Sequence, residues 1–330
     1  MPAAAGLPRI PLADLPTPYQ PAPRLAAAAG LRELWIKRED SSGPALGGNK
    51  IRQIELILGA AEAAGADTVI TTAASQSNFC RALAGCAARA GFSCRLLLRS
   101  AGGTAPVGNL LLMRLFGAEI SFTDATDPWH PDVRASLDAI AEDVRAEGGK
   151  PFVVQLPGET APLAAAAWAL AGAELAQDFS RAGQVPDILA VAAGSALTLS
   201  GLALGLAQQG LATTLLGVSV QQPAARLRPW VADVVVRTAH LLGWQVKEPL
   251  ARLVITDDQI PPGYAQPNAA GMRALTLAAR TEGLVLDPSY TAKALAGLIA
   301  AARPGMRAAF LHSGGAPSLF AQSAAVAAAL

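Results

Sequence analysis

The sequence contains few cysteines, little net charge and no long apolar run. Its three cysteines, Cys80, Cys86 and Cys94, have neither CxxC spacing nor companion histidines, so the sequence indicates neither a metal site nor a disulfide framework and fits a reducing cytoplasm. The formal net charge is +1 and like charges are not clustered, which gives no electrostatic signature of binding to nucleic acid or to an anionic membrane surface. Small molecules are therefore the expected partners.

Signals for export and for membrane insertion are also missing. Residues 1–23 are rich in proline and lack a basic segment followed by an apolar run. The alanine-rich stretch 163–177 is too short for a membrane span and contains Glu174. What the chain does have is material for a core, because 52% of its 330 residues are hydrophobic and only 15% are charged. We expect a globular protein with about two lobes.

Short β-branched runs alternate along the chain with segments of helix length. The runs that predict strands lie at 67–73, 93–99, 118–124, 151–156, 187–193, 214–220, 252–256 and 307–313. The segments that predict helices lie at 49–64, 78–90, 131–147, 163–178, 198–209, 267–282, 289–302 and 317–329. This alternation is typical of parallel sheets covered by helices on both faces, so the predicted fold class is α/β.

The stretch "GGNK" ends in a lysine, Lys50, that opens an amphipathic helix. The apolar positions of this helix are Ile51, Ile54, Ile57, Leu58 and Ala61, and Arg52, Glu55 and Glu62 fall on the opposite side. Lys50 lies on the apolar side, so it either reaches outward along the first turn or points into a lined cavity. In a cavity, the helix's positive end and desolvation both lower its pKa and favour an amine nucleophile. Gly47 and Gly48 permit a tight loop against a ligand, and Asn49 is a preferred N-cap residue.

Three further turns place polar groups where strands end and helices begin. In "SQSN", Ser77 and Asn78 lie at a helix start, where they serve either as caps or as ligand contacts. In "GSALT", backbone N–H groups and the hydroxyls of Ser195 and Thr198 suit a phosphate, although an ordinary strand-to-helix loop has the same pattern. In "HSGG", at 312–315, two glycines imply a close approach of the backbone.

Taken in order, "IKRED…GGNK", "QSN", the Gly-Ser turn, "EGLVLDPSYTAK" and "HSGGAP" closely resemble one family of enzymes dependent on pyridoxal 5'-phosphate (PLP). It includes D-cysteine desulfhydrase and 1-aminocyclopropane-1-carboxylate (ACC) deaminase. The resemblance extends from residue 8 to residue 320 and implies a tryptophan synthase β-like fold, PLP fold type II. It further implies a large domain of residues 1–48 and 160–330, a small domain of residues 49–159 with the cofactor in the cleft between them, and a homodimer.

The resemblance also assigns roles to nine residues and implies no metal. The residues it places in the reaction are Lys50, Ser77, Tyr264 and Tyr290. The residues it places around the cofactor, besides Lys50, are Asn78, Gly194, Ser195, Thr198 and Ser313.

By this resemblance, Lys50 forms a Schiff base with PLP and, once released, moves the α-proton of the substrate as a general base. Asn78 bonds the phenolic oxygen of PLP, and Ser77 faces the substrate carboxylate or the reacting carbon. The 194–198 turn cradles the phosphate. Ser313 lies near the pyridine nitrogen, and the two tyrosines line the substrate pocket.

The chain departs from the family pattern at several of these turns. Ala196 and Leu197 stand where a second glycine pair is usual, and 73–75 reads Ala-Ala-Ser where glycines usually precede "QSN". Phe79 replaces a polar residue, and "QLPGET" at 155–160 replaces a Gly-Gly-Ser-type turn. These departures leave room for a substrate other than the familiar ones of the family.

One departure concerns the type of reaction. The deaminase has a glutamate after its pocket tyrosine, whereas this chain has Thr291 after Tyr290, and the hydroxyl of Ser313 resembles the desulfhydrase. A hydroxyl partner leaves the ring nitrogen mostly neutral, which suits β-elimination. We therefore expect α,β-elimination from a small amino acid, giving ammonia and a 2-oxo acid. The alternatives are ring-opening deamination, racemisation or β-replacement, or a catalytically silent α/β protein that binds a phosphorylated ligand.

Overall fold

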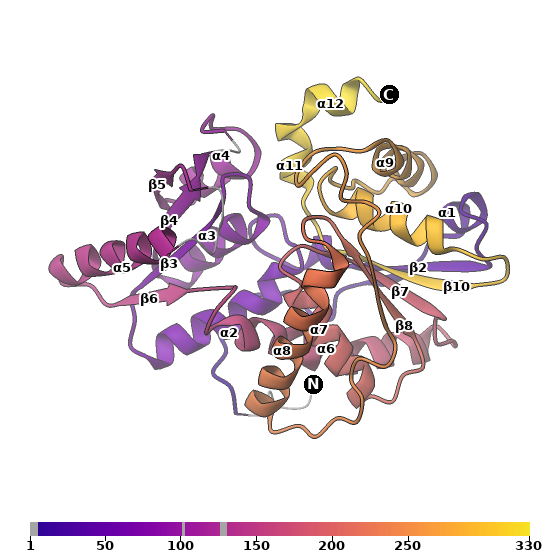
Figure 1. Cartoon of the computed structure of the whole chain (residues 1–330), viewed down its shortest axis with the longest axis horizontal. Coiled ribbons are helices and arrows are strands. Elements are labelled where there is room, and N and C mark those ends of the chain that lie inside the picture. The colour runs from indigo at the N-terminus through magenta and orange to yellow at the C-terminus, as the bar shows by residue number, and fades with distance from the viewer. Residues whose placement is uncertain (1–5, 101–102, 126–130) are drawn as a thin grey trace.

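The computed structural model describes residues 6–100, 103–125 and 131–330 (Figure 1). It contains two sheets of mostly parallel strands, one of six strands and one of four, both flanked by helices. The α/β class predicted from the alternation of strands and helices is confirmed.

The six-stranded sheet has the strand order β1-β2-β10-β7-β8-β9, and only the edge strand β1 is antiparallel to its neighbour. The strands are β1 (Tyr19–Pro21), β2 (Glu33–Arg38), β7 (Ile188–Ala193), β8 (Thr214–Ser219), β9 (Leu253–Thr256) and β10 (Arg307–His312). Its central strands read as continuous apolar runs because both faces are buried. In β7, Leu189 and Val191 face one core cluster, whereas Ile188 and Ala190 face another.

Helices from distant parts of the chain cover the two faces of this sheet. One face packs against α6 (Ala161–Arg181), α7 (Leu197–Gln208) and α8 (Ala224–Leu242). The other packs against α1 (Pro23–Ala28), α9 (Ala269–Glu282) and α10 (Thr291–Ala301).

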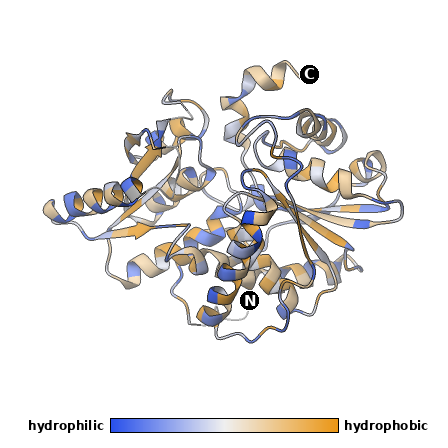
Figure 2. Cartoon of the chain, in the orientation of Figure 1, coloured by the Kyte–Doolittle hydropathy of each residue, from blue (hydrophilic) through white to orange (hydrophobic). Residues whose placement is uncertain are grey.

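The four-stranded sheet has the order β5-β4-β3-β6 with all strands parallel. The strands are β3 (Thr68–Ala74), β4 (Ser93–Arg99), β5 (Glu119–Thr123) and β6 (Pro151–Val154). One face packs against α2 (Lys50–Ala63), α3 (Asn78–Ala90) and α4 (Gly108–Leu115), and the other packs against α5 (Pro131–Ala146). Figure 2 shows apolar strands in both sheets and polar positions gathered on outer helices such as α5.

Helices α6 and α7 lie unusually close to each other, and glycines make this possible. A Cβ on Gly201 would lie 2.2 Å from the carbonyl oxygen of Ala165, and one on Gly205 would lie 2.5 Å from that of Ala169. Side chains at these positions would push the helices apart. The close packing matters for the site because α7 begins at the Gly-Ser turn.

Several elements differ from the sequence predictions. All eight predicted strands are present, the one at 93–99 with the same ends and the others with ends shifted by one or two residues. However, β1 and β2 were missed, as were α1, α4 and α8. The predicted helix 317–329 is wrong, since the chain forms two short helices there, α11 (Ala316–Ala321) and α12 (Ser323–Ala327). The two sheets draw on the parts of the chain expected for two domains, but the boundaries at 48/49 and 159/160 stay a prediction.

Two other sequence observations have a structural counterpart. All three cysteines are buried free thiols, and burial raises the pKa of Cys80 and of Cys86 to about 12. In the described part of the chain, no helix combines the length and the apolar character needed to cross a membrane.

Candidate active site

A pocket lies where the carboxyl ends of β3, β4, β7 and β10 meet the start of α2. Its walls come from both sheets, the arrangement expected for a ligand site in an α/β protein. All nine residues singled out from the sequence line it: Lys50, Ser77, Asn78, Gly194, Ser195, Thr198, Tyr264, Tyr290 and Ser313. Residues separated by more than 250 positions in the chain are thus brought to one cavity.

Lys50 is the first residue of α2 and points into the pocket. Of the two interpretations of this lysine, the structure shows the one with a lined cavity. In the described part of the chain its ammonium group has no hydrogen bond or ion pair, and burial lowers its pKa to about 8. A lysine with this pKa has far more neutral amine near pH 7 than an exposed one, which makes it a suitable nucleophile.

The loop before Lys50 packs against the chain's own backbone rather than against the pocket. Gly47 has φ +60°, and a Cβ there would lie 2.2 Å from the carbonyl oxygen of Asp40. Neither Gly47 nor Gly48 lines the pocket, so the tight loop that these glycines permit against a ligand stays a prediction. Asn49 occupies the N-cap position but its side chain makes no capping bond. Its Nδ2 donates to Thr198 Oγ1 at 2.9 Å instead.

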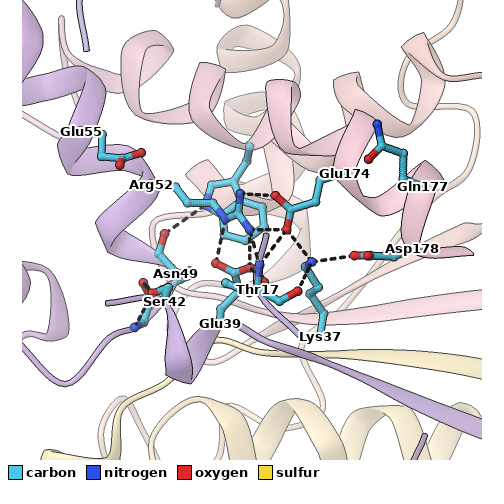
Figure 3. A network of polar contacts seen from close by, with 12 residues as sticks. Thr17, Lys37, Glu39, Ser42, Asn49, Arg52, Glu55, Glu174, Gln177 and Asp178 are labelled. Carbon is cyan, nitrogen blue, oxygen red and sulfur yellow. Dashed lines mark hydrogen bonds and ion pairs between the residues drawn. The ribbon is translucent and has the colours of Figure 1, made fainter. Parts of the chain in front are cut away.

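In its first two turns, the side of α2 opposite the apolar stripe is also buried, in a network of charged side chains (Figure 3). Arg52 donates to both carboxylate oxygens of Glu39 at 2.8 Å and to Glu174 at 2.7 Å. Lys37 Nζ donates to Glu174 at 2.5 Å and to Asp178 at 2.6 Å. Although burial alone raises the pKa of Glu174, the charges and hydrogen bonds of Arg52 and Lys37 bring it to about 2.

This network joins β2, the 3-10 turn Glu39–Ser41, α2 and α6. Arg52 is two residues from Lys50, so the ion pairs hold the first turn of α2 against α6. The direction in which Lys50 leaves the helix is thereby fixed. A sequence pattern could not show this, because Glu174 lies 122 residues from Arg52.

The turn between β3 and α3 presents Ser77 and Asn78 to the pocket. Ser77 is the N-cap of α3, and its Oγ accepts a hydrogen bond from the Cys80 backbone N–H at 3.2 Å. Asn78 Oδ1 accepts a hydrogen bond from Asn109 Nδ2 at 2.9 Å, and the same Nδ2 donates to the Gln76 carbonyl at 2.8 Å. With its oxygen occupied in this way, Asn78 has its Nδ2 left to donate. Sequence reasoning missed Asn109, which is fully buried at the start of α4.

The turn between β7 and α7 offers hydrogen-bond donors. Thr198 Oγ1 accepts from Asn49 Nδ2 at 2.9 Å and from Gln53 Nε2 at 3.2 Å. Both acceptor sites of the hydroxyl are thus used, and its own hydrogen is left to donate. The first N–H groups of α7 have no acceptor within the helix. Donors at a helix N-terminus suit a phosphate group.

The departure from glycine at Ala196 does not change the backbone of this turn. Ala196 has φ +60°, in the left-handed region that favours glycine. The chain therefore keeps a glycine-like conformation with an alanine, at a cost of about 1 kcal/mol. Gly194 keeps its glycine, and a Cβ there would lie 3.1 Å from the Tyr290 ring. The narrow entrance to the turn leaves little space for a side chain.

Tyr264 and Tyr290 hydrogen-bond through their hydroxyls at 2.5 Å, with the rings edge to face. Burial, followed by the neighbouring tyrosine, raises the pKa of Tyr290 well above its ordinary value. Burial also raises the pKa of Tyr264, against the effect of its hydrogen bond. Both phenols are therefore neutral at physiological pH, and whichever hydroxyl accepts the bond between them keeps its own hydrogen to donate.

The residue after Tyr290 does not face the pocket. The buried carboxylate of Asp287 accepts hydrogen bonds from the backbone N–H groups of Ser289, Tyr290 and Thr291. Thr291 Oγ1 also donates to Asp287 Oδ1 at 2.7 Å. Asp287 thus fixes the turn that carries Tyr290, and Thr291 supports this turn. Ser313 lines the pocket and Thr291 does not.

Several pocket residues were not identified from the sequence as site residues. Phe79 and Leu156, at two of the departures from the family pattern, do line the pocket. So do Thr72 and Arg99, at the carboxyl ends of β3 and β4. Arg99 is the last residue of a correctly predicted strand, so the rule that ligands bind at strand ends could have found it.

Comparisons with known proteins agree with this geometry. A model of the family described as "Pyridoxal-phosphate dependent enzyme" matches residues 10–314. The chain is 39% identical over 325 residues to a D-cysteine desulfhydrase of Klebsiella pneumoniae, covering 95% of this chain and 96% of that one. It is 38% identical over 328 residues to a D-cysteine desulfhydrase of Salmonella paratyphi B, with the same coverage of the two chains.

Solved structures give the same result. One described as an ACC deaminase homologue superposes with a TM-score of 0.90 and 31% identity, with full coverage of both chains. O-ureido-L-serine synthase matches with a TM-score of 0.68 at 17% identity, covering 97% of this chain and 93% of that one. At this identity the second match supports the fold alone.

The chain belongs to the family of pyridoxal-phosphate-dependent enzymes. Within it, the chain is D-cysteine desulfhydrase-like and is also similar to an ACC deaminase homologue. The resemblance seen in the order of the sequence motifs is therefore confirmed, as is the cofactor class.

Proposed function

We propose that this protein is a PLP-dependent lyase that catalyses the deaminating α,β-elimination of a small amino acid. The similarity to proteins named D-cysteine desulfhydrase supports this proposal. The observation that carries the proposal is Lys50, an unpaired lysine with a lowered pKa in a pocket lined from both sheets. With D-cysteine as substrate, the products are sulfide, ammonia and pyruvate.

The residues of the pocket fit PLP. Lys50 would supply the amine for the cofactor aldehyde, and the donors of the 194–198 turn, Thr198 and Ser195 among them, would hold the phosphate. Asn78, its oxygen held by Asn109, would donate from Nδ2 to the phenolic oxygen of the cofactor. Ser313 would face the ring nitrogen. PLP, when bound, withdraws electrons from the α-carbon of the substrate.

The remaining groups act on the substrate. Ser77 and the N-terminus of α3 bind the substrate carboxylate, because the helix start presents N–H groups and a favourable dipole. The amine of Lys50, once free, takes the proton from the α-carbon as a general base. The bond from the β-carbon to its leaving group then breaks. One of the neutral hydroxyls of Tyr264 and Tyr290 donates a proton or a hydrogen bond to that leaving group.

A second reaction, ring-opening deamination, is suggested by the ACC deaminase homologue. The hydrogen bond from Thr291 to Asp287 argues for elimination instead, because it directs the Thr291 side chain away from the pocket. The position after Tyr290 therefore supplies no acid to the ring nitrogen. Purified holoenzyme incubated with D-cysteine should release sulfide, ammonia and pyruvate, and incubated with ACC should release little ammonia. If only ACC yields ammonia, the proposed elimination is wrong and ring-opening deamination takes its place. If neither substrate yields a product, both proposed reactions are contradicted.

We also propose that the protein is a homodimer located in the cytoplasm. In each chain, residues 1–48 and 160–330 form one domain and residues 49–159 form the other. The family resemblance supports the dimer, and the reduced cysteines fit the compartment. Light scattering on the purified holoenzyme should give twice the mass of the 33.6 kDa chain.

A further inference from the structure

Arg99 is a cation of the pocket for which the proposed reaction has no use. It is the last residue of β4 and lies beside Ala74 of β3 in the register of the four-stranded sheet. Its side chain lines the pocket, and its Nη1 is buried without a hydrogen-bond partner. In the described part of the chain, the guanidinium group forms no ion pair either. Leaving a buried guanidinium nitrogen unpaired is costly, so this group points to an absent anion.

Thr72 provides a second unpartnered group on the same face of the sheet. It precedes Ala74 by two residues, and because side chains alternate along a strand, Thr72, Ala74 and Arg99 share one face. Thr72 Oγ1 is buried without a partner and also lines the pocket. A hydroxyl and a guanidinium group on neighbouring strands thus both offer hydrogen-bond donors to the pocket.

The described residues around the pocket include no acidic partner for these donors. Among its described lining residues there is no aspartate or glutamate. The cofactor phosphate has donors in the turn before α7, and the substrate carboxylate has them at Ser77 and the start of α3. Arg99 and Thr72 belong to neither set, since they lie at the ends of two adjacent strands of the small sheet.

We propose that Arg99 and Thr72 bind a second anionic group, carried on the β-carbon of the substrate. The preferred substrate class is then an amino acid whose β-carbon carries an anionic leaving group, such as a sulfonate that departs as sulfite, ahead of one with a neutral thiol; a side-chain carboxylate would bind in the same place without being eliminated. This inference rests on the proposed function for the amino acid and PLP bound at Lys50. A guanidinium group is suited to the role because it can donate two parallel hydrogen bonds to such an anion.

The experiment uses aspartate and asparagine, which have the same shape and differ in side-chain charge. Each enantiomer is titrated into the holoenzyme, and binding is followed by the change in the visible absorption of bound PLP. The wild-type protein should bind aspartate more tightly than asparagine by at least about 10-fold, as expected for a charge-assisted pair. R99Q should reduce this ratio to about 1, and T72V should reduce it partly.

R95Q is the matched control. Arg95 is on the same strand but forms ion pairs with Glu119 and Glu147, and it does not line the pocket, so the ratio should not change. Equal affinity of the wild-type protein for both amino acids overturns the inference. So does an equal loss of both affinities in R99Q, which would assign Arg99 to the α-carboxylate. T72V tests the site independently should R99Q fail to fold.

The readout also separates this inference from the proposed reaction. If D-cysteine yields no sulfide while the preference for aspartate depends on Arg99, the thiol elimination is wrong and the acidic substrate class stands. Turnover of cysteate at a higher kcat/KM than cysteine, lost in R99Q, supports both. If no amino acid changes the visible absorption, the amino-acid site is absent and the inference is overturned with it.

Discussion

Asn109 Nδ2 donates a hydrogen bond to Asn78 Oδ1 at 2.9 Å and so fixes which end of the Asn78 amide faces the pocket. The donor lies on α4 and the acceptor at the start of α3, and Gln76 joins the same network through its carbonyl oxygen. Free rotation of Asn78 would present its oxygen to the phenolic oxygen of the cofactor about as often as its nitrogen. The bond from Asn109 removes that alternative.

The first prediction follows from this bond. Asn109→Ala should weaken PLP binding by about 5- to 10-fold, the equivalent of one net hydrogen bond, and should shift the visible absorption of the bound cofactor. Fluorescence titration of the apoprotein with PLP measures the affinity. Leu111→Ala, at an exposed position of the same helix, is the control and should bind PLP as the wild type does. Unchanged affinity and spectrum in Asn109→Ala would show that Asn78 needs no support.

The second prediction concerns the lowered pKa of Lys50. Burial brings it to about 8, against an ordinary value of 10.5, and only the neutral amine reacts with an aldehyde. The rate at which the apoprotein recovers its visible absorption with PLP should therefore rise with pH and level off above about pH 8. Stopped-flow absorbance measures the rate. A rate still rising steeply at pH 10 would mean that Lys50 has an exposed lysine's pKa.

Replacement of the amine provides the matched variant for this prediction. Lys50→Ala should bind PLP without forming the covalent visible band and should lose activity by at least about 100-fold, because both the attachment point and the general base are removed. Circular dichroism should show the same helix content as the wild type. Retained activity would remove Lys50 from the reaction.

The third prediction tests the left-handed conformation at Ala196. Ala196→Gly should stabilise the protein by about 0.5–1 kcal/mol, since glycine adopts a positive φ without the steric cost that alanine has there. Urea unfolding of the apoprotein measures the free energy. The control is Ala203→Gly, the same substitution within α7, which should instead destabilise by about 1 kcal/mol. Destabilisation by both variants would mean that Ala196 carries no strain.

The sequence was sufficient for those parts of the fold and site that depend on local patterns. The alternation of strands and helices predicts parallel sheets covered by helices. The position of Lys50 on an otherwise apolar stripe leaves two interpretations open, and the order of the motifs along the chain favours the one with a cavity. By contrast, β2 was missed because two charged residues, Lys37 and Arg38, are typical of an exposed segment. In the structure Lys37 is buried and forms ion pairs with two acidic residues of α6. Asn109 was missed for a similar reason, since its partners come from another turn.

The same limit applies to the loop before Lys50. Gly47 and Gly48 permit a close approach of the backbone, but the pattern does not say to what. In the structure the close contact of Gly47 is the carbonyl oxygen of Asp40. The sequence pattern shows which backbone conformations the glycines allow, whereas tertiary packing determines which atoms they contact.

The fourth prediction follows from the buried network beneath α2. Arg52 and Lys37 hold the pKa of Glu174 at about 2, against an ordinary value of 4.5. The unfolded chain therefore binds more protons than the folded one between these values, and stability is lost as the pH falls from about 4.5 towards 2. The contribution of this carboxylate, fully present above about pH 5, is about 3 kcal/mol.

Glu174→Gln removes the titrating group and tests this contribution. The variant should be less stable than the wild type at pH 7, because two buried cations lose a charged partner. Its stability should also fall less steeply between pH 4.5 and pH 2, as measured by urea unfolding of the apoproteins at each pH. Glu159→Gln, at an exposed position before α6, is the control and should keep the wild-type slope. If Glu174→Gln also keeps that slope, the acid sensitivity comes from other carboxylates and the network does not hold Glu174 ionised.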